Sequence, residues 1–233
     1  MAQTSLTWLG HGSFRLDSAA GKRIYLDPWL GNPRCPESER APERMNVIAL
    51  THGHSDHLGE TVELAKRHGP AIVAIFELAS WLAAQGVPGA AERGMNKGGT
   101  QDVDGISFTM THALHSGGLV QDGAIVYLGE AAGFVIELED GLKIYASGDT
   151  AVFSDMQLIG RIYEPDLAIL PIGDHFTMGP REAAVALELL GVERCVPGHY
   201  GTFPLLTGTP EKLRELAPRV EILAPEPGET ISL

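Results

Sequence analysis

Residues 51–59 read THGHSDHLG and hold four ligand-type side chains within six positions: His52, His54, Asp56 and His57. Burying so many imidazole and carboxylate groups without partners is costly, and a loop needs no such composition. Imidazole and carboxylate together suit divalent transition metals, zinc first, with manganese, iron or nickel also admissible. In extended backbone, side chains at i and i+2 share a face, so His52 and His54 can hold one ion. Asp56 and His57, on the turn into the next helix, can face a second ion.

Strands and helices alternate outward from this cluster. NVIAL at 46–50 reads as a buried strand that ends at the histidines, and GETVELAKRHG at 59–69 has helical spacing with a glycine stop. Residues 5–18 and 21–29 alternate apolar and polar side chains, which predicts two antiparallel strands. Residues 132–150 contain an Asp-Gly pair between two alternating runs and predict a hairpin. Antiparallel pairs mixed with strand-helix units predict an α+β (mixed α/β) fold of two sheets with helices outside them.

Length, composition and net charge indicate the number of domains and the kind of partner. The 233 residues are 44% hydrophobic and 20% charged, which is enough for one sizeable core, and we expect one domain over 1–233. A net charge of −13 repels phosphate backbones and anionic membrane surfaces, so we expect a small-molecule substrate and neither a nucleic-acid nor a membrane partner. The sequence leaves a homo-oligomer open.

The chain also reads as a cytoplasmic protein. Its apolar runs are too short to span a bilayer, and MAQTSLTWLG lacks the basic start and apolar stretch of a signal peptide. Cys35 and Cys195 form no disulfide framework or CxxC motif, which fits a reducing compartment.

Further ligand-type residues recur just after predicted buried strands. These are Asp27 after RIYL, His115 after ISFTMTHAL, Asp149 after KIYASG and His199 after RCVPG. Residues at strand ends can converge on one sheet edge, which builds a site from distant parts of the sequence. Taken singly, each has an ordinary alternative, as a turn or cap carboxylate or as a surface or hydrogen-bonded histidine.

As a set, these residues carry a resemblance to a known family. THGHSDH resembles the His-x-His-x-Asp-His signature of the metallo-β-lactamase superfamily, and the single residues follow in that superfamily's order across 27–199. The resemblance implies a metallo-β-lactamase-like four-layer αββα sandwich with two metal ions at one edge of the two sheets. By position it assigns His52, His54 and His115 to the first ion, Asp56, His57 and His199 to the second, and Asp149 to the bridge between them. Asp27 matches an aspartate that supports the ligands.

Other stretches point to one branch of that superfamily. GHGSFRL, YLDPWL, ALHSGG, SGDT, PIGDHFTMGP and PGHYGTFP resemble compact, mostly uncharacterised metal-dependent hydrolases related to the ascorbate-6-phosphate lactonases. No lactone- or phosphate-binding signature can be matched, so the lactonase substrate does not transfer.

The resemblance implies a binuclear metal-dependent hydrolase that cleaves a small ester, lactone or phosphoester. A metal pair lowers the pKa of bound water from about 15.7 to roughly 7 and so supplies a nucleophile at neutral pH. Asp56 would orient that nucleophile as it coordinates. The alternatives are a nuclease or cyclic-nucleotide phosphodiesterase, which the acidic balance weakens, and a non-catalytic metal-binding or sensor protein. A structural zinc site needs only four closed ligands, so the larger set favours turnover.

Three more histidines lie near the matched motifs. His11 and His175 each sit in a Gly-flanked segment after a predicted strand, and we take them as candidate catalytic residues that donate a proton or contact a developing oxyanion. Orienting a ligand is the alternative for each. His112 fits packing in the strand before His115 equally well.

Neighbouring loops and aromatic residues could shape a substrate pocket. Lys97 lies in the Gly-rich segment 94–100, for which a flexible loop is favoured over an anion site. Four apolar residues beside the matched motifs could line a pocket or belong to the core: Phe176, Met178, Tyr200 and Phe203. Residues 92–124 as a whole predict a strand that runs into a functional loop.

Overall fold

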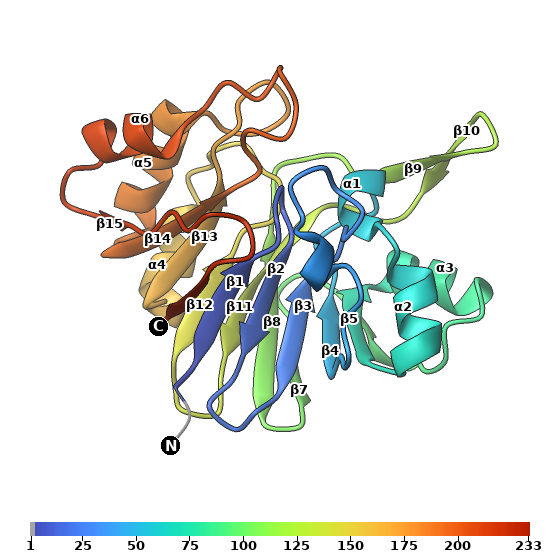
Figure 1. Cartoon of the computed structure of the whole chain (residues 1–233). Coiled ribbons are helices and arrows are strands. Elements are labelled where there is room, and N and C mark those ends of the chain that lie inside the picture. Colours follow the sequence, from blue (N-terminus) through green and yellow to red (C-terminus); the bar gives the residue numbers. More distant parts are fainter. Residues whose placement is uncertain (1–2) are drawn as a thin grey trace.

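The computed structural model describes residues 3–233. Two seven-stranded sheets pack face to face, and helices cover their outer sides (Figure 1). This arrangement confirms the predicted four-layer αββα sandwich.

The first sheet combines an antiparallel and a parallel half. Its order is β16-β1-β2-β3-β4-β5-β6. The strands are β1 (Ser5–Trp8), β2 (Phe14–Asp17), β3 (Arg23–Leu26), β4 (Val47–Ala49), β5 (Ala71–Ile75), β6 (Gly94–Met95) and β16 (Thr230–Ser232). Pairing is antiparallel from β16 to β3 and parallel from β3 to β6. The last strand of the chain therefore completes the sheet that the first strand begins.

The second sheet has the same two halves. Its order is β15-β14-β13-β12-β11-β8-β7. The strands are β7 (Thr100–Val103), β8 (Ile106–His112), β11 (Ala132–Glu137), β12 (Lys143–Ala146), β13 (Leu167–Pro171), β14 (Arg194–Gly198) and β15 (Glu221–Ile222). Pairing is antiparallel from β7 to β12 and parallel from β12 to β15. The predicted hairpin at 132–150 is β11–β12.

The helices follow the parallel strands. They are α1 (Ser55–Leu58), α2 (Thr61–His68), α3 (Phe76–Ala84), α4 (Met156–Tyr163), α5 (Pro180–Leu190) and α6 (Pro210–Leu216), with 3-10 turns at Glu37–Glu39 and Ala91–Arg93. Gly69 and Gly191 end α2 and α5 in the left-handed conformation, which glycine adopts without a steric penalty. Among the described residues, no helix combines the length and hydropathy needed to cross a bilayer.

The facing sheets enclose one continuous apolar core. Its largest fully buried side chains include Trp8, Tyr25, Phe108, Phe134 and Tyr145, which come from both sheets. Each such side chain contributes on the order of 1.5–3 kcal/mol of transfer free energy when it leaves water. This rigid core fixes the strand ends on which the candidate site is built.

Two sequence predictions need correction. Residues 5–18 form two strands instead of one, because Gly10 and His11 have φ values of 88° and 52° and reverse the chain between β1 and β2. Within 92–124, where a loop was expected beyond the strand, β9 (Gly118–Gln121) and β10 (Ala124–Tyr127) form a hairpin that projects from the body (Figure 1).

Candidate metal centre

The predicted ligands converge at the ends of strands from both sheets. His52 follows β4, Asp149 follows β12 and His199 follows β14, so residues more than a hundred positions apart in sequence meet at one edge of the sandwich. His54 lies at the start of α1, which also carries Asp56 and His57.

A first group consists of His52, His54 and His115. The Nδ1 atom of His54 lies 3.0 Å from His52 Nε2 and 3.3 Å from His115 Nε2. Zinc binds imidazole nitrogen at about 2.0–2.1 Å, so two nitrogens on one tetrahedral ion are roughly 3.3 Å apart. The three nitrogens lie within 4.8 Å of one another and can hold one ion.

A second group lies beside the first. Its ligand atoms, from His11, Asp56, His57 and His199, also fall within 4.8 Å of one another. His57 and His199 are buried, yet His57 Nε2 and both ring nitrogens of His199 have no hydrogen-bond partner. Buried polar atoms are normally satisfied, so these nitrogens fit a site that binds an ion.

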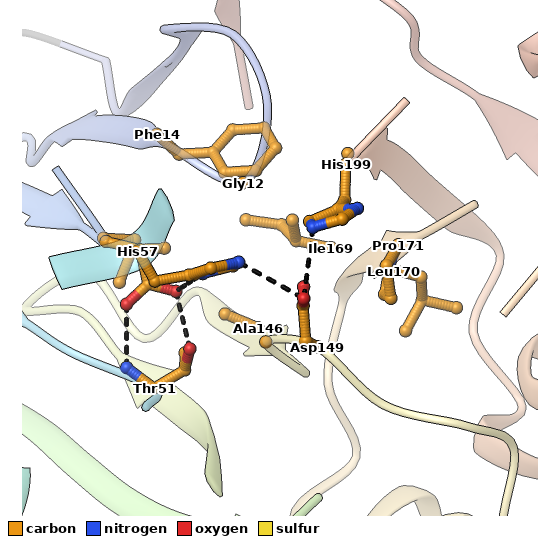
Figure 2. A pocket seen from close by; sticks show the side chains of 14 residues that line it. Gly12, Phe14, Thr51, His57, Ala146, Asp149, Ile169, Leu170, Pro171 and His199 are labelled. Atoms are coloured by element: carbon orange, nitrogen blue, oxygen red, sulfur yellow. Dashed lines mark hydrogen bonds and ion pairs between the residues drawn. The ribbon is translucent and has the colours of Figure 1, made fainter. Parts of the chain in front are cut away.

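The carboxylate of Asp149 contacts both groups. Its Oδ2 atom lies 3.1 Å from His199 Nε2, 3.3 Å from His57 Nε2 and 3.7 Å from His115 Nε2. Figure 2 shows the first two of these contacts. A cavity of about 30 Å³, which has room for one water molecule, lies beside this carboxylate between the two sheets (Figure 2).

Asp27 and Thr51 hold two of the ligand rings in position. Asp27 Oδ2 accepts hydrogen bonds from His57 Nδ1 at 2.8 Å and from the Thr51 hydroxyl at 2.6 Å. Since that hydroxyl donates to Asp27, its oxygen accepts from His52 Nδ1, 2.9 Å away. This network places the lone pairs of His52 and His57 on their Nε2 atoms, which face the site.

Replacement of Thr51 by Val is expected to lower the affinity for metal by about 10–100-fold, because such supporting hydrogen bonds orient the ligand rings. Isothermal titration of chelator-treated protein with zinc measures the change. Thr61→Val is the matched control, since Thr61 is also buried but its hydroxyl has no partner. Equal affinities for the two variants would contradict the role assigned to Thr51.

Backbone strain also accumulates at the site. His11, Asp27 and His199 have φ values of 52°, 45° and 54°, in the left-handed region that non-glycine residues seldom adopt. Each such residue costs about 1–3 kcal/mol and persists only where its surroundings enforce it. Here the amide of His199 donates to the carbonyl of His11 at 2.8 Å, so two of the strained turns hold each other.

The histidines of the two groups differ in their pKa values. Burial lowers the pKa of His52 well below its ordinary value, and burial also lowers the pKa values of His54 and His115. These three imidazoles are therefore neutral at pH 7 and ready to bind a metal. In the second group, burial opposes a charge on His57 and His199, but Asp149 raises the pKa of His57 well above normal and that of His199 to about 9.

Metal binding to the second group is therefore expected to release about two protons at pH 7, one from His57 and one from His199, because a ligating imidazole must lose its proton. The affinity of this group should rise with pH up to about 9, while that of the first group is nearly constant above pH 7. Calorimetric titration of chelator-treated protein in buffers of different ionisation enthalpy counts the protons. A binding heat independent of the buffer would rule out this charge state.

The structure places the remaining predicted residues as follows. His11 is buried, with its Nε2 3.0 Å from Asp56 Oδ2 and its Nδ1 3.0 Å from the Thr202 hydroxyl. His175 is exposed in the loop after β13, where its ring contacts Phe176 at a centroid distance of 4.5 Å. The structure brings His11 into the cluster and leaves His175 at its periphery; the catalytic role of each stays a prediction.

Two other residues considered in the sequence analysis, Lys97 and His112, contact each other. Lys97 Nζ donates to His112 Nδ1 at 3.1 Å and to Glu130 at 2.8 Å. His112 is exposed, in contrast to the packed position that its strand suggested as an alternative.

A cavity of about 600 Å³ opens over the metal ligands. Its lining residues are Trp29, His54, Ser55, Asp56, His115, Ser116, Asp149, Phe176, His199 and Phe203. Phe176 and Phe203 thus line the cavity, whereas Met178 and Tyr200 are buried in the core, where Tyr200 stacks on Trp8. Sequence reasoning missed Thr51, Thr202 and Trp29, although each is within one to three residues of a matched motif residue.

Comparison with known proteins identifies the family. A profile of the beta-lactamase superfamily domain matches residues 22–200, which include all seven predicted metal ligands. The chain belongs to the beta-lactamase superfamily.

Two relatives, each named UPF0173 metal-dependent hydrolase, match nearly the whole chain. The protein from Koribacter versatilis is 47% identical over 97% of both chains, and that from Solibacter usitatus is 50% identical over 97% of this chain and 98% of its own. The chain is accordingly a metal-dependent hydrolase.

Solved structures also resemble this chain. Igni18, a metallo hydrolase from Ignicoccus hospitalis, covers 100% of this chain and 99% of its own with 31% identity and a TM-score of 0.87. An isothiocyanate hydrolase from Delia radicum gut bacteria covers 98% and 99% with 23% identity and a TM-score of 0.73, a likeness of fold.

Proposed function

We propose that this chain is a cytoplasmic, binuclear metal-dependent hydrolase that cleaves a small ester, lactone or phosphoester with a metal-activated water. The observation that carries the proposal is the position of Asp149, whose Oδ2 atom lies within 3.7 Å of ligand nitrogens from both groups. A carboxylate between two sets of histidines is suited to bridge two ions. The donor set of imidazole and carboxylate fits zinc best and also admits manganese, iron or nickel.

The two groups of residues divide the metal ligands between them. His52, His54 and His115 would hold one ion; Asp56, His57 and His199 would hold the other, with Asp149 shared. When bound, the pair supplies an activated water and a Lewis acid that polarises the attacked carbonyl or phosphoryl oxygen.

The chain's own residues prepare the acid-base chemistry. Asp56 lines the cavity, and although burial favours its neutral form, the hydrogen bond from His11 and the nearby imidazole of His199 hold the pKa of Asp56 well below its usual value. Burial lowers the pKa of His11 to about 4, so His11 is neutral at pH 7 and keeps its single proton on Nε2, toward Asp56. An ionised Asp56 held in this way can accept a hydrogen bond from a water molecule and so orient it.

Metal analysis tests the binuclear proposal. We expect about two divalent ions per chain after gentle purification, with zinc the best-retained metal. Fewer than one tightly bound divalent ion per chain would contradict the proposal.

Replacement of Asp56 by Ala tests turnover separately. The variant should keep its fold, judged by far-UV circular dichroism, and lose hydrolysis of esters, lactones and phosphodiesters. A variant that hydrolyses as fast as the wild type would exclude the role of Asp56, whereas no hydrolysis by the metal-loaded wild type would favour the non-catalytic sensor alternative. Preference for nucleic-acid or cyclic-nucleotide phosphodiesters would favour the nuclease or phosphodiesterase alternative. We expect a small-molecule substrate, with no nucleic-acid or membrane partner; gel filtration would report a homo-oligomer.

A further inference from the structure

The cavity over the metal ligands has three aromatic walls from three different loops. Trp29 follows β3, Phe176 follows β13 and Phe203 follows β14. The rings of Trp29 and Phe203 lie 6.1 Å apart at 30° to each other, and both pack around the buried His11 ring, at 5.2 and 5.5 Å. The core packing of His11 therefore holds these two rings in place.

Phe176 has no comparable packing partner in the core. Its side chain is 51% exposed, although large apolar side chains gain free energy by leaving water. An aromatic ring kept at the mouth of a polar site fits a role in contacting a ligand better than a role in folding.

Outside the predicted metal ligands, the described part of the lining contributes no cationic side chain. Among the described residues that line the cavity there is no Lys or Arg; the polar lining consists of the metal ligands, Ser55 and Ser116. Sites for phosphate groups usually present arginine, lysine or the amino end of a helix. The helix at this cavity, α1, has only four residues, two of which are predicted metal ligands.

Two basic side chains on segments next to the cavity, Arg34 and Lys97, already contact other groups. Arg34 lies over the rings of Trp8 and Tyr200, at 4.8 and 5.7 Å, and within 3.8 Å of Glu226. Lys97 donates to Glu130 at 2.8 Å. Neither side chain lines the cavity, so an anionic group that a substrate carries away from the scissile bond, beyond reach of the metal ligands, would meet the aromatic rings instead of a counter-charge.

We propose that the cavity takes an uncharged carboxylic ester or lactone with an aromatic or branched apolar group beside the scissile bond, and discriminates against substrates that carry an anionic group away from the scissile bond. This inference rests on the proposed hydrolase function and narrows its substrate class. In the reaction, the oxygen of water forms a bond to the acyl carbon and the bond to the leaving oxygen breaks. One water proton ends on the leaving alcohol, and the other leaves with ionisation of the carboxylic acid product.

Matched substrates test the charge preference of the zinc-loaded protein. Phenyl acetate and 4-carboxyphenyl acetate share the scissile bond and differ by a distal carboxylate; their rates are normalised to hydrolysis by free hydroxide. We expect kcat/KM to be at least ten-fold higher for phenyl acetate. Equal values, or a preference for the charged ester, would overturn the inference and leave the hydrolase proposal intact. No hydrolysis of any ester, lactone or phosphoester by protein with two bound ions would instead overturn the proposed function.

Variants of the walls test whether the aromatic rings carry the preference. Phe176→Ala should raise KM for phenyl acetate about ten-fold with little change in kcat, while Leu205→Ala, an equally exposed side chain in a neighbouring loop outside the lining, should change neither. Phe176→Lys should shift the preference toward 4-carboxyphenyl acetate.

Binding without turnover provides a separate readout. Calorimetry with benzyl alcohol and 4-(hydroxymethyl)benzoate should give tighter binding of the neutral alcohol, weakened by Phe176→Ala. Unchanged KM in Phe176→Ala, together with equal binding of the two ligands, would refute the role of the aromatic walls.

Discussion

The Asp149→Asn variant is expected to lose more than about 100-fold in both kcat/KM and affinity for the second metal ion. Residues that only support a metal ligand typically contribute about 10–100-fold, and Asp149 contacts the ligand nitrogens themselves. The substitution keeps the shape of the side chain and removes its charge. His57 and His199 then lose the carboxylate that lies 3.3 and 3.1 Å from their Nε2 atoms. Metal analysis and steady-state kinetics on the purified variant measure the two losses.

Asp122→Asn is the matched control for this experiment. Asp122 is an exposed carboxylate in the turn of the β9–β10 hairpin, where its φ of 52° suits Asn equally well. This variant should retain full metal content and activity. If Asp149→Asn behaved like Asp122→Asn, with two ions bound and activity within ten-fold of wild type, the carboxylate would not bridge the two groups.

The clustering of the candidate metal ligands could be predicted from sequence because its signals are local. THGHSDH places four ligand-type residues at a strand end, and Asp27, Asp149 and His199 each follow a short apolar segment that predicts a buried strand. Strands that share a core bring their ends to common edges of the sheets. A prediction of the strands therefore predicts both the fold class and the convergence of the residues that follow them. The family resemblance then supplied the order of the ligands, which spacing alone does not give.

The supporting contacts could not be predicted in the same way, because they depend on packing between distant segments. Thr51 reaches Asp27 across 24 positions, and His11 reaches Thr202 across 191. Apolar residues occupy even positions on both sides of Gly10 and His11, at Leu6, Trp8, Phe14 and Leu16, which hides the reversal between β1 and β2. The period of two is the same on both sides of the turn, so only the positive φ values reveal it.

The β9–β10 hairpin shows a different limit. Its turn carries Asp122-Gly123, which is a strong hairpin signal, but the surrounding region is rich in glycine and was therefore assigned to a loop. The strands have only four residues each, and Val120 and Ile125 are 73% and 80% exposed. Apolar and polar residues alternate in a strand when one of its faces is buried, and the face that carries Val120 and Ile125 is not.

The Gly173→Ala variant is expected to lose about 3 kcal/mol of unfolding free energy and about 100-fold in kcat. Gly173 follows β13, and a methyl group there would overlap the carbonyl oxygen of His199. A backbone oxygen cannot move aside as a flexible side chain does, so the overlap costs stability and displaces the metal ligand. Displacement of a reacting group by about 1 Å typically costs about 100-fold in rate. Denaturant unfolding and steady-state kinetics measure the two effects.

Gly160→Ala separates the two effects. Gly160 lies in α4, where an added methyl group would overlap the carbonyl oxygen of Leu190 at the end of α5, away from the metal ligands. Both variants force a side chain against backbone, so both should lose similar unfolding free energy. Gly160→Ala should keep wild-type kcat and metal content below its unfolding transition, whereas Gly173→Ala should not. A loss of kcat in both variants would mean that activity follows global stability; a loss in Gly173→Ala alone would tie it to the position of His199.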